Sequence, residues 1–364
     1  MALPVKEHLL GLKRVRNPEK RLGEGILRLD KNENTVGFPP GFVELLRKEI
    51  TSDFLSAYPE VDSLYERIAT WLGLKVENIY LSSGSDAAIK SVFEVFIDPG
   101  DSVLLLSPTY AMFYVYAKIF QAETVEICYK DGLELSADEI IKAINSLKPK
   151  VACIANPNSP TGTVILKEDL VKIIRNAAEN NCVMLLDEAY ALFSDISAID
   201  LIGRYPNLIV MRTFSKAFGL ASARLGFAIG QPEIIGALHK VRPMYEINAF
   251  AARFGELILD NYGLVEENIK EINKGKEFLE RELGWLKIPF YRSYGNFILI
   301  DVGSFQESSR IARGLADKKI LIKGGFKEDV LKNCIRVTFG SVSQMKKFLE
   351  ALKQILVFSE REKL

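Results

Sequence analysis

The chain has little histidine. Its 364 residues include two histidines, His8 and His239. A Ser-His-Asp triad, a Cys-His pair or a zinc site with imidazole ligands would have to be built from almost nothing. The sequence therefore directs attention to other chemical groups, and no metal site is expected.

Cysteine is also scarce, and the charges balance. The four cysteines, Cys128, Cys153, Cys182 and Cys334, lie far apart and form no Cys-x-x-Cys pair. We expect free thiols in a reducing compartment. Lysine plus arginine equals aspartate plus glutamate at 47 each, so no overall charge points to nucleic acid or to an anionic membrane.

Long apolar runs are missing. No run approaches the roughly 18 residues that a membrane-spanning helix needs, and the first residues, "MALPVKEHLLGLKRVR", contain no long apolar stretch. We therefore expect a cytoplasmic protein. Its length leaves room for a large core and two domains.

Short apolar runs are present in number, and they alternate with helical patterns. The runs "SVLLLS" at 102, "VACIA" at 151, "CVMLLD" at 182 and "LIVMR" at 208 predict buried strands, and residues 166–181 have the periodicity of an amphipathic helix. This alternation predicts an α/β fold around a mostly parallel sheet. The last hundred residues differ, with a charged helix over 264–284 and then the strands "NFILIDV", "ILIKGG" and "CIRVTFG". They predict a smaller α+β domain.

Polar clusters follow four of the predicted strands. "SPTY" comes after Leu106, "NPNSPTG" after Ala155, "DEAY" after Leu186 and "RTFSK" after Met211. In an open α/β sheet, ligands bind beyond the carboxyl ends of the strands. We therefore expect these clusters to converge, although they span a hundred residues.

Lys216 lies at the mouth of an apolar segment, beside Ser215 and eight residues before Arg224. Taken alone, it could be an ordinary surface lysine. If it is desolvated and near other cations, its amine is partly neutral and can condense with a carbonyl. Ser215 and Arg224 could then anchor a phosphate, Arg224 through a bidentate contact.

Asp187 and Tyr190 lie in "DEAY", at the end of another apolar run. Such a carboxylate is usually a helix cap or an ion-pair partner, and such a tyrosine is usually part of the core. If Lys216 holds pyridoxal phosphate, Asp187 is also the partner that the pyridine nitrogen requires, and Tyr190 could hydrogen-bond to the ring hydroxyl.

The stretch "LSSGSDAAIKSVFEVF" at 81–96 predicts a strand, a Gly-Ser turn and a helix. An ordinary helix cap would explain it. The free N–H groups of the first helical turn could instead hold a phosphate, with Gly84 permitting close approach and Ser85 and Asp86 at its border. Tyr110, in "SPTYAMF", could stack on a flat ring or pack in the core.

Together these motifs resemble the pyridoxal-phosphate aminotransferases of the aspartate aminotransferase fold type, and more narrowly the histidinol-phosphate aminotransferase-like branch. The similarity runs from "LRLDKNEN" (27–34) to "IRVTFGS" (335–341). It implies pyridoxal 5'-phosphate and a large domain, 49–245, with a mostly parallel seven-stranded sheet flanked by helices. Residues 1–48 with 246–364 would form a small domain that closes over the active site.

The resemblance also implies roles for individual residues. Lys216 is similar to the lysine that binds the cofactor and moves the proton. The implied cofactor contacts are Gly84, Ser85, Asp86, Ser215 and Arg224 at the phosphate and Tyr110, Asp187 and Tyr190 at the ring. Tyr58, in "AYPE", resembles a tyrosine that reaches the neighbouring subunit's cofactor, which implies a homodimer with shared active sites. Arg336 resembles the arginine that binds the substrate α-carboxylate, and Lys323 and Asn34 are placed with it at the substrate.

Three features depart from the family pattern. The family's "NPNNPTG" reads "NPNSPTG" here, so either Ser159 or Asn158 could contact the ring hydroxyl. The N-terminal segment lacks a "PYxPG"-like stretch, and Lys323 stands where an arginine is common. The cations Arg14, Arg16, Lys20 and Arg21 could meet a phosphorylated acceptor, although a solvated face explains them equally well.

The leading hypothesis is a transaminase that moves an amino group from glutamate to a small, polar keto acceptor, with or without a phosphate. The same constellation could decarboxylate a phosphorylated amino acid, because the bond that breaks depends on substrate orientation. A third alternative is a regulator that binds the cofactor without turnover. The expected partners are small molecules and a second copy of the chain, with no nucleic acid and no membrane.

Overall fold

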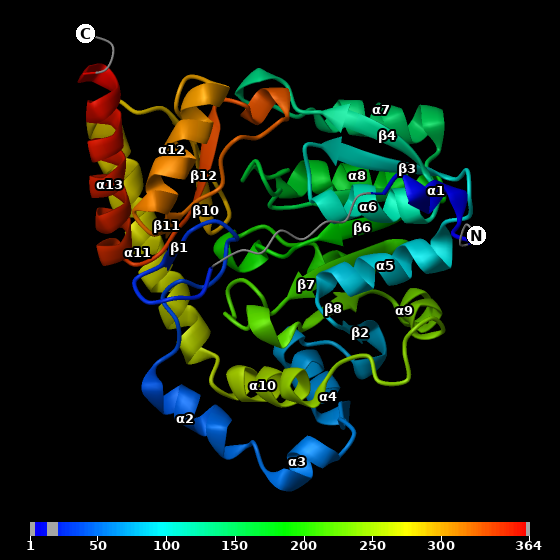
Figure 1. The fold of residues 1–364 in the computed structure, drawn as a ribbon. Coiled ribbons are helices and arrows are strands. Elements are labelled where there is room, and N and C mark those ends of the chain that lie inside the picture. Colours follow the sequence, from blue (N-terminus) through cyan, green and yellow to red (C-terminus); the bar gives the residue numbers. More distant parts are fainter. Residues whose placement is uncertain (1–3, 13–20, 362–364) are drawn as a thin grey trace.

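The computed structural model describes residues 4–12 and 21–361. Its centre is a seven-stranded sheet with the order β2-β8-β7-β6-β5-β3-β4 (Figure 1). β8 runs antiparallel to both of its neighbours, and the other pairs are parallel. The strands are β2 (Ile79–Ser82), β3 (Ser102–Ser107), β4 (Glu123–Cys128), β5 (Val151–Ala155), β6 (Val183–Asp187), β7 (Leu208–Thr213) and β8 (Gly226–Ile229). The predicted α/β fold with a mostly parallel sheet is confirmed.

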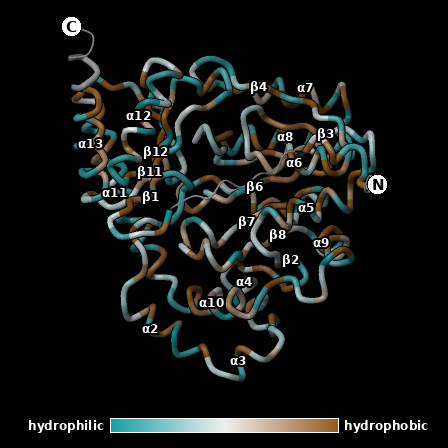
Figure 2. Tube along the Cα trace, in the orientation of Figure 1, coloured by the Kyte–Doolittle hydropathy of each residue, from teal (hydrophilic) through white to brown (hydrophobic). Residues whose placement is uncertain are grey.

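Helices cover both faces of this sheet. Strand residues alternate between the faces: in β3, Val103 and Leu105 pack into one apolar cluster, and Leu104 and Leu106 pack into the other. The first cluster includes residues of α5 (Ser85–Phe96), α6 (Ala111–Ile119) and α9 (Pro232–His239). The second includes residues of α4 (Asp62–Leu72), α7 (Ala137–Leu147), α8 (Lys167–Glu179) and α10 (Ala249–Asp260). Figure 2 shows the apolar residues along these central strands.

A second body lies beside the carboxyl edge of the large sheet (Figure 1). Its antiparallel sheet has the order β12-β10-β9, and its two-stranded parallel sheet pairs β1 with β11. The strands are β1 (Leu27–Arg28), β9 (Phe290–Tyr291), β10 (Phe297–Asp301), β11 (Ile320–Leu321) and β12 (Cys334–Thr338), and the helices are α11 (Gly263–Trp285), α12 (Phe305–Asp317) and α13 (Val342–Arg361). An apolar cluster of its own holds this body together, and β1 brings the N-terminal segment into it. The domain boundaries near 49 and 245 stay a prediction.

Three further helices belong to the N-terminal part. α1 (Glu7–Leu10) contacts α6, and α2 (Pro40–Lys48) and α3 (Ser52–Ser56) lead along the outside of the molecule towards α4. The four cysteines are free thiols, and three of them are buried, as predicted. Among the described residues, no helix is both long enough and apolar enough to cross a bilayer.

Candidate active site

A cavity of about 610 Å³ opens beyond the carboxyl ends of the central strands. Each of the four polar clusters contributes to its wall: Tyr110 follows β3, Ser159 follows β5, Tyr190 follows β6, and Lys216 follows β7. Parallel strands bring their carboxyl ends to one edge of the sheet, which explains why residues so far apart in sequence meet here. The predicted convergence is confirmed.

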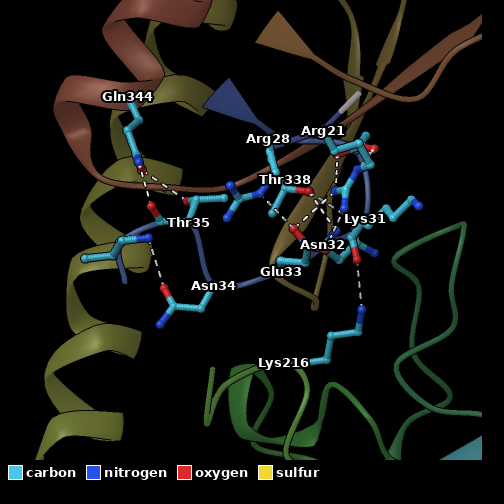
Figure 3. A network of polar contacts seen from close by, with 12 residues as sticks. Arg21, Arg28, Lys31, Asn32, Glu33, Asn34, Thr35, Lys216, Thr338 and Gln344 are labelled. Carbon is cyan, nitrogen blue, oxygen red and sulfur yellow. Dashed lines mark hydrogen bonds and ion pairs between the residues drawn. The ribbon is translucent and has the colours of Figure 1, made fainter. Parts of the chain in front are cut away.

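Lys216 is half-buried at this edge. Its Nζ donates a hydrogen bond to the carbonyl oxygen of Lys31 over 2.9 Å, and it lies 5.6 Å from the centre of the Tyr190 ring. The backbone of the N-terminal segment therefore fixes the position of the amine (Figure 3), and Lys216 lines the cavity.

Asp187 is the last residue of β6, and 4% of its surface is exposed. Burial raises the pKa of Asp187 to about 6, against the opposing effects of the Ala189 backbone N–H and of the Lys216 charge. Ala189 N donates to Oδ1 over 3.0 Å. A positive charge bound next to Asp187 would stabilise the ionised form of this buried carboxyl group.

Tyr190 is buried, and its Oη accepts a hydrogen bond of 2.9 Å from Nδ2 of Asn32. Burial alone would raise the pKa of Tyr190. The positive charges of Lys216 and Arg336, with hydrogen bonds from Asn32 and Ser159, outweigh burial and lower this pKa below its usual value. A lowered pKa makes the phenol a stronger hydrogen-bond donor to a polar group in the cavity.

Residues at the start of α5 form a cradle for an anion. Gly84 has φ +83°, and a Cβ there would collide with the guanidinium of Arg224. Arg224 Nη2 donates to Asp86 Oδ1 over 2.7 Å, and its Nη1 donates to Ser215 Oγ over 3.3 Å. Ser85 and Asp86 line the cavity beside them. The free N–H groups of this helix start and the arginine are the elements of a phosphate site.

Arg336 reaches the opposite wall from β12. Its Nη2 donates to Asp30 O over 3.0 Å, and its Nη1 donates to Ser159 Oγ over 3.4 Å. Nε is buried and has no hydrogen-bond partner among the described residues. Such a donor costs free energy unless an acceptor arrives, and a carboxylate is the acceptor that best matches a guanidinium. Backbone hydrogen bonds in both directions with Arg336 place Lys323 at the same cavity.

Asn158 and Ser159 have different surroundings in the structure. Asn158 is 1% exposed, and its Nδ2 donates to Pro108 O over 3.0 Å and to Thr161 Oγ1 over 2.8 Å, while its Oδ1 accepts from Thr109 Oγ1 over 2.8 Å. These contacts engage its amide in the loop. Ser159 is the member of the pair that lines the cavity.

Several other candidates lie away from the cavity wall. Tyr58 is 75% exposed, and its ring stacks on that of Tyr245 with 4.3 Å between centroids. Asn34 uses its Oδ1 to accept from the backbone N–H groups of Val36 and Gly37. Arg21 is in ion pairs with the carboxylates of Asp30 (2.7 Å) and Glu33 (2.9 Å). Arg14, Arg16 and Lys20 lie outside the described residues.

Sequence reasoning did not single out every residue of the cavity. Asn32, which bonds to Tyr190, lies in the quoted motif "DKNEN", but nothing in the motif shows that its side chain turns inward. Lys31, Lys327 and Glu328 also line the cavity. The charges that follow "KGGF" were a usable signal for the last two. The described residues contain no group of His, Cys, Asp and Glu side chains suited to a metal.

Comparisons with known proteins agree with this geometry. Residues 24–352 match the family Aminotransferase class I and II. The chain is 34% identical to histidinol-phosphate aminotransferase 1 of Carboxydothermus hydrogenoformans, over 91% of this chain and 93% of the relative. It is also 34% identical to the histidinol-phosphate aminotransferase of Ruminiclostridium cellulolyticum, over 90% and 92%.

Solved structures share the fold. Histidinol-phosphate aminotransferase from Sinorhizobium meliloti in complex with pyridoxal-5'-phosphate has a TM-score of 0.88 and 23% identity, over 98% of both chains. Aspartate aminotransferase from Thermus thermophilus with maleate has a TM-score of 0.77 and 22% identity, over 91% of both chains.

Proposed function

Because the chain belongs to the class I and II aminotransferases, we propose that the cavity around Lys216 is where it moves an amino group from glutamate to a small keto acceptor. The relatives make the protein a pyridoxal 5'-phosphate-dependent transaminase of the histidinol-phosphate aminotransferase branch. One observation carries the proposed site: an amine, a buried carboxylate and a helix start with an arginine line one cavity.

The residues present fit the cofactor. A Cβ at Gly84 would fill the space beside Arg224, and Asp187 is a buried carboxylate placed to pair with a cationic ring nitrogen. We assign the phosphate to the backbone N–H groups of Ser85 and Asp86 and to the side chains of Ser215 and Arg224. We assign the ring to Asp187, Tyr110, Tyr190 and Ser159, and the covalent bond to Lys216. When bound, the cofactor supplies an electron-withdrawing ring that weakens the bonds at the substrate α-carbon.

The protein's own residues then handle substrate and proton. Arg336 binds the α-carboxylate of the amino donor, which supplies the acceptor that its Nε lacks. Once the donor's amine has replaced it at the cofactor, Lys216 Nζ is free to take the proton from the donor's α-carbon as a general base and to deliver it to a different carbon as a general acid. The Lys31 carbonyl oxygen accepts a hydrogen bond of 2.9 Å from Nζ and so orients the amine.

The acceptor that the cavity favours is anionic. Lys31, Lys323 and Lys327 line the wall together with Glu328, and the whole lining has six basic side chains against three carboxylates. Their excess of positive charge would attract a second anionic group on the substrate. A phosphorylated acceptor fits both this charge and the printed names of the relatives, histidinol-phosphate aminotransferases.

We also propose a homodimer with shared active sites. Tyr58, Met244, Leu55 and Tyr245 are exposed on one chain, at 75%, 82%, 62% and 45%. Tyr58 and Tyr245 stack on each other and form one exposed patch, and contiguous exposed apolar patches mark interaction surfaces. In the dimer, Tyr58 would leave the surface and contact the neighbouring cofactor phosphate. The proposal includes the domain division at 49 and 245 and a cytoplasmic location, where the four thiols stay reduced.

The experiment that tests the function mixes the cofactor-loaded protein with excess glutamate alone. Loss of the visible absorbance band, with one 2-oxoglutarate formed per site, is the expected result. An unchanged band with glutamate, together with carbon dioxide release from a phosphorylated amino acid, would establish the decarboxylase alternative. Mixed dimers of Tyr58→Phe and Lys216→Ala chains test the shared sites: activity differing from the average of the parents is expected, and simple averaging would contradict sharing.

A further inference from the structure

Asn32 belongs to the part of the N-terminal segment that lies between Thr338 of β12 and Lys216 (Figure 3). It follows β1, and it is 2% exposed. Its φ of +56° is in the left-handed region, which asparagine, aspartate and glycine adopt more readily than other residues. A buried amide costs free energy unless its oxygen and its nitrogen have hydrogen-bond partners.

Thr338 fixes the orientation of the Asn32 amide. The Thr338 Oγ1 accepts from the Asn32 backbone N–H over 3.0 Å and donates its proton to Asn32 Oδ1 over 3.2 Å. Asn296 Nδ2 donates to the Asn32 carbonyl over 3.1 Å. Because Oδ1 is taken by Thr338, the amide must present Nδ2 to Tyr190 Oη, 2.9 Å away.

The consequence concerns the direction of the hydrogen bonds at Tyr190. Its Oη accepts from Asn32, so the phenol's own proton is left for the cavity side. The charged and titratable groups that act on the phenol are Lys216, Arg336 and Tyr110, and Ser159 is a second side chain that hydrogen-bonds to it. Among the contacts of the phenol, Asn32 is a neutral amide donor fixed in one orientation by the small sheet.

We infer that Asn32 is a positioning residue, which acts on the reaction through Tyr190 by holding the phenol as a hydrogen-bond donor towards the bound cofactor. This inference rests on the proposed function. The same strand, β12, carries Thr338 and, two residues earlier, Arg336, so the group that fixes the phenol and the group proposed to bind the carboxylate share one support.

Three variants separate this role from simple anchoring of the segment. Asn32→Gly removes the donor and tolerates the left-handed backbone. Asn32→Asp keeps the shape and the backbone preference but replaces the donor with an acceptor. Thr35→Val is the matched control, because Thr35 anchors the same segment to Gln344 over 3.0 Å and does not contact Tyr190.

The readout is the pH midpoint of the visible absorbance change of each protein loaded with pyridoxal phosphate. Without the Asn32 donor, the Tyr190 phenol gives a weaker hydrogen bond to the bound cofactor. The negative charge on the cofactor oxygen is then less stabilised, so the nitrogen of Lys216 keeps its proton up to a higher pH. We expect the midpoint to rise by about one pH unit in Asn32→Gly, by more in Asn32→Asp, and not at all in Thr35→Val.

A double-mutant cycle tests whether Asn32 acts through the phenol. In a Tyr190→Phe background, Asn32→Gly should give no further shift. A full shift in that background, or a wild-type midpoint in fully loaded Asn32→Gly and Asn32→Asp, would overturn the inference. A wild-type protein with no visible band would overturn the proposed function itself, so the two failures are distinguishable.

Discussion

The buried carboxylate of Asp187 lowers the free energy of unfolding of the cofactor-free protein, but it stabilises a cation bound beside it. The substitution Asp187→Asn should reveal both effects. Burial raises the pKa of Asp187 from 3.8 to about 6. The folded chain therefore binds more protons than the unfolded chain between these values, so stability falls as pH rises through this window. Two pKa units correspond to about 3 kcal/mol of lost stability at neutral pH, an order-of-magnitude figure.

The cofactor-free Asp187→Asn protein should therefore be more stable than the wild type at neutral pH. The gain in free energy of unfolding should grow from about 1 kcal/mol near pH 4.5 to about 3 kcal/mol above pH 7, because only the wild type carries a buried charge there. Urea denaturation of both proteins across this range measures it. Asp317→Asn, at an exposed position at the end of α12, is the control for losing one negative charge.

The same substitution should damage function. Without the carboxylate, nothing at this position keeps the ring nitrogen protonated, and turnover with glutamate should lose several kcal/mol of barrier lowering, about a thousandfold in rate. An Asp187→Asn protein with wild-type stability at every pH and near-normal turnover would refute the reasoning, because the carboxylate would then be neither desolvated nor required.

Three further predictions follow from the cavity. Gly84→Ala should weaken pyridoxal phosphate binding at least about tenfold in equilibrium dialysis, because alanine is strained at this positive φ and its methyl group would push the Arg224 guanidinium out of the cradle; unchanged affinity would contradict the phosphate cradle. Arg336→Ala should raise the KM for glutamate about a hundredfold while the visible band persists; an unaltered KM would move the carboxylate site elsewhere. The affinity of the wild type for the cofactor should fall, up to about tenfold per unit, below about pH 6, where Asp187 must lose a proton to bind; an equal fall in Asp187→Asn would assign it to another group.

The large sheet could be predicted because its signal is local. Runs such as "VACIA" are apolar at every position, since a central parallel strand is buried on both faces, and the structure buries all five residues of β5. The small body was harder. "ILIKGG" forms only the two-residue β11, and it pairs with β1, almost three hundred residues earlier. Such pairing depends on tertiary packing that a short window does not contain.

The site shows the same division. Lys216, Asp187 and Tyr190 could be found because each follows a recognisable strand. Asn158 and Ser159 are neighbours of similar polarity, and the loop contacts with Pro108 and Thr109 decide which one faces the cavity. Asn32 is placed at the site by contacts with Tyr190 and Thr338, which lie far away in sequence, so a short window around Asn32 does not predict its role.

The most direct test of the central claim is to reduce the pyridoxal phosphate-loaded protein with borohydride and to locate the cofactor by peptide mass spectrometry. The account predicts one modification per chain, on Lys216. Modification of Lys31, Lys323 or Lys327, which line the same cavity, would contradict it.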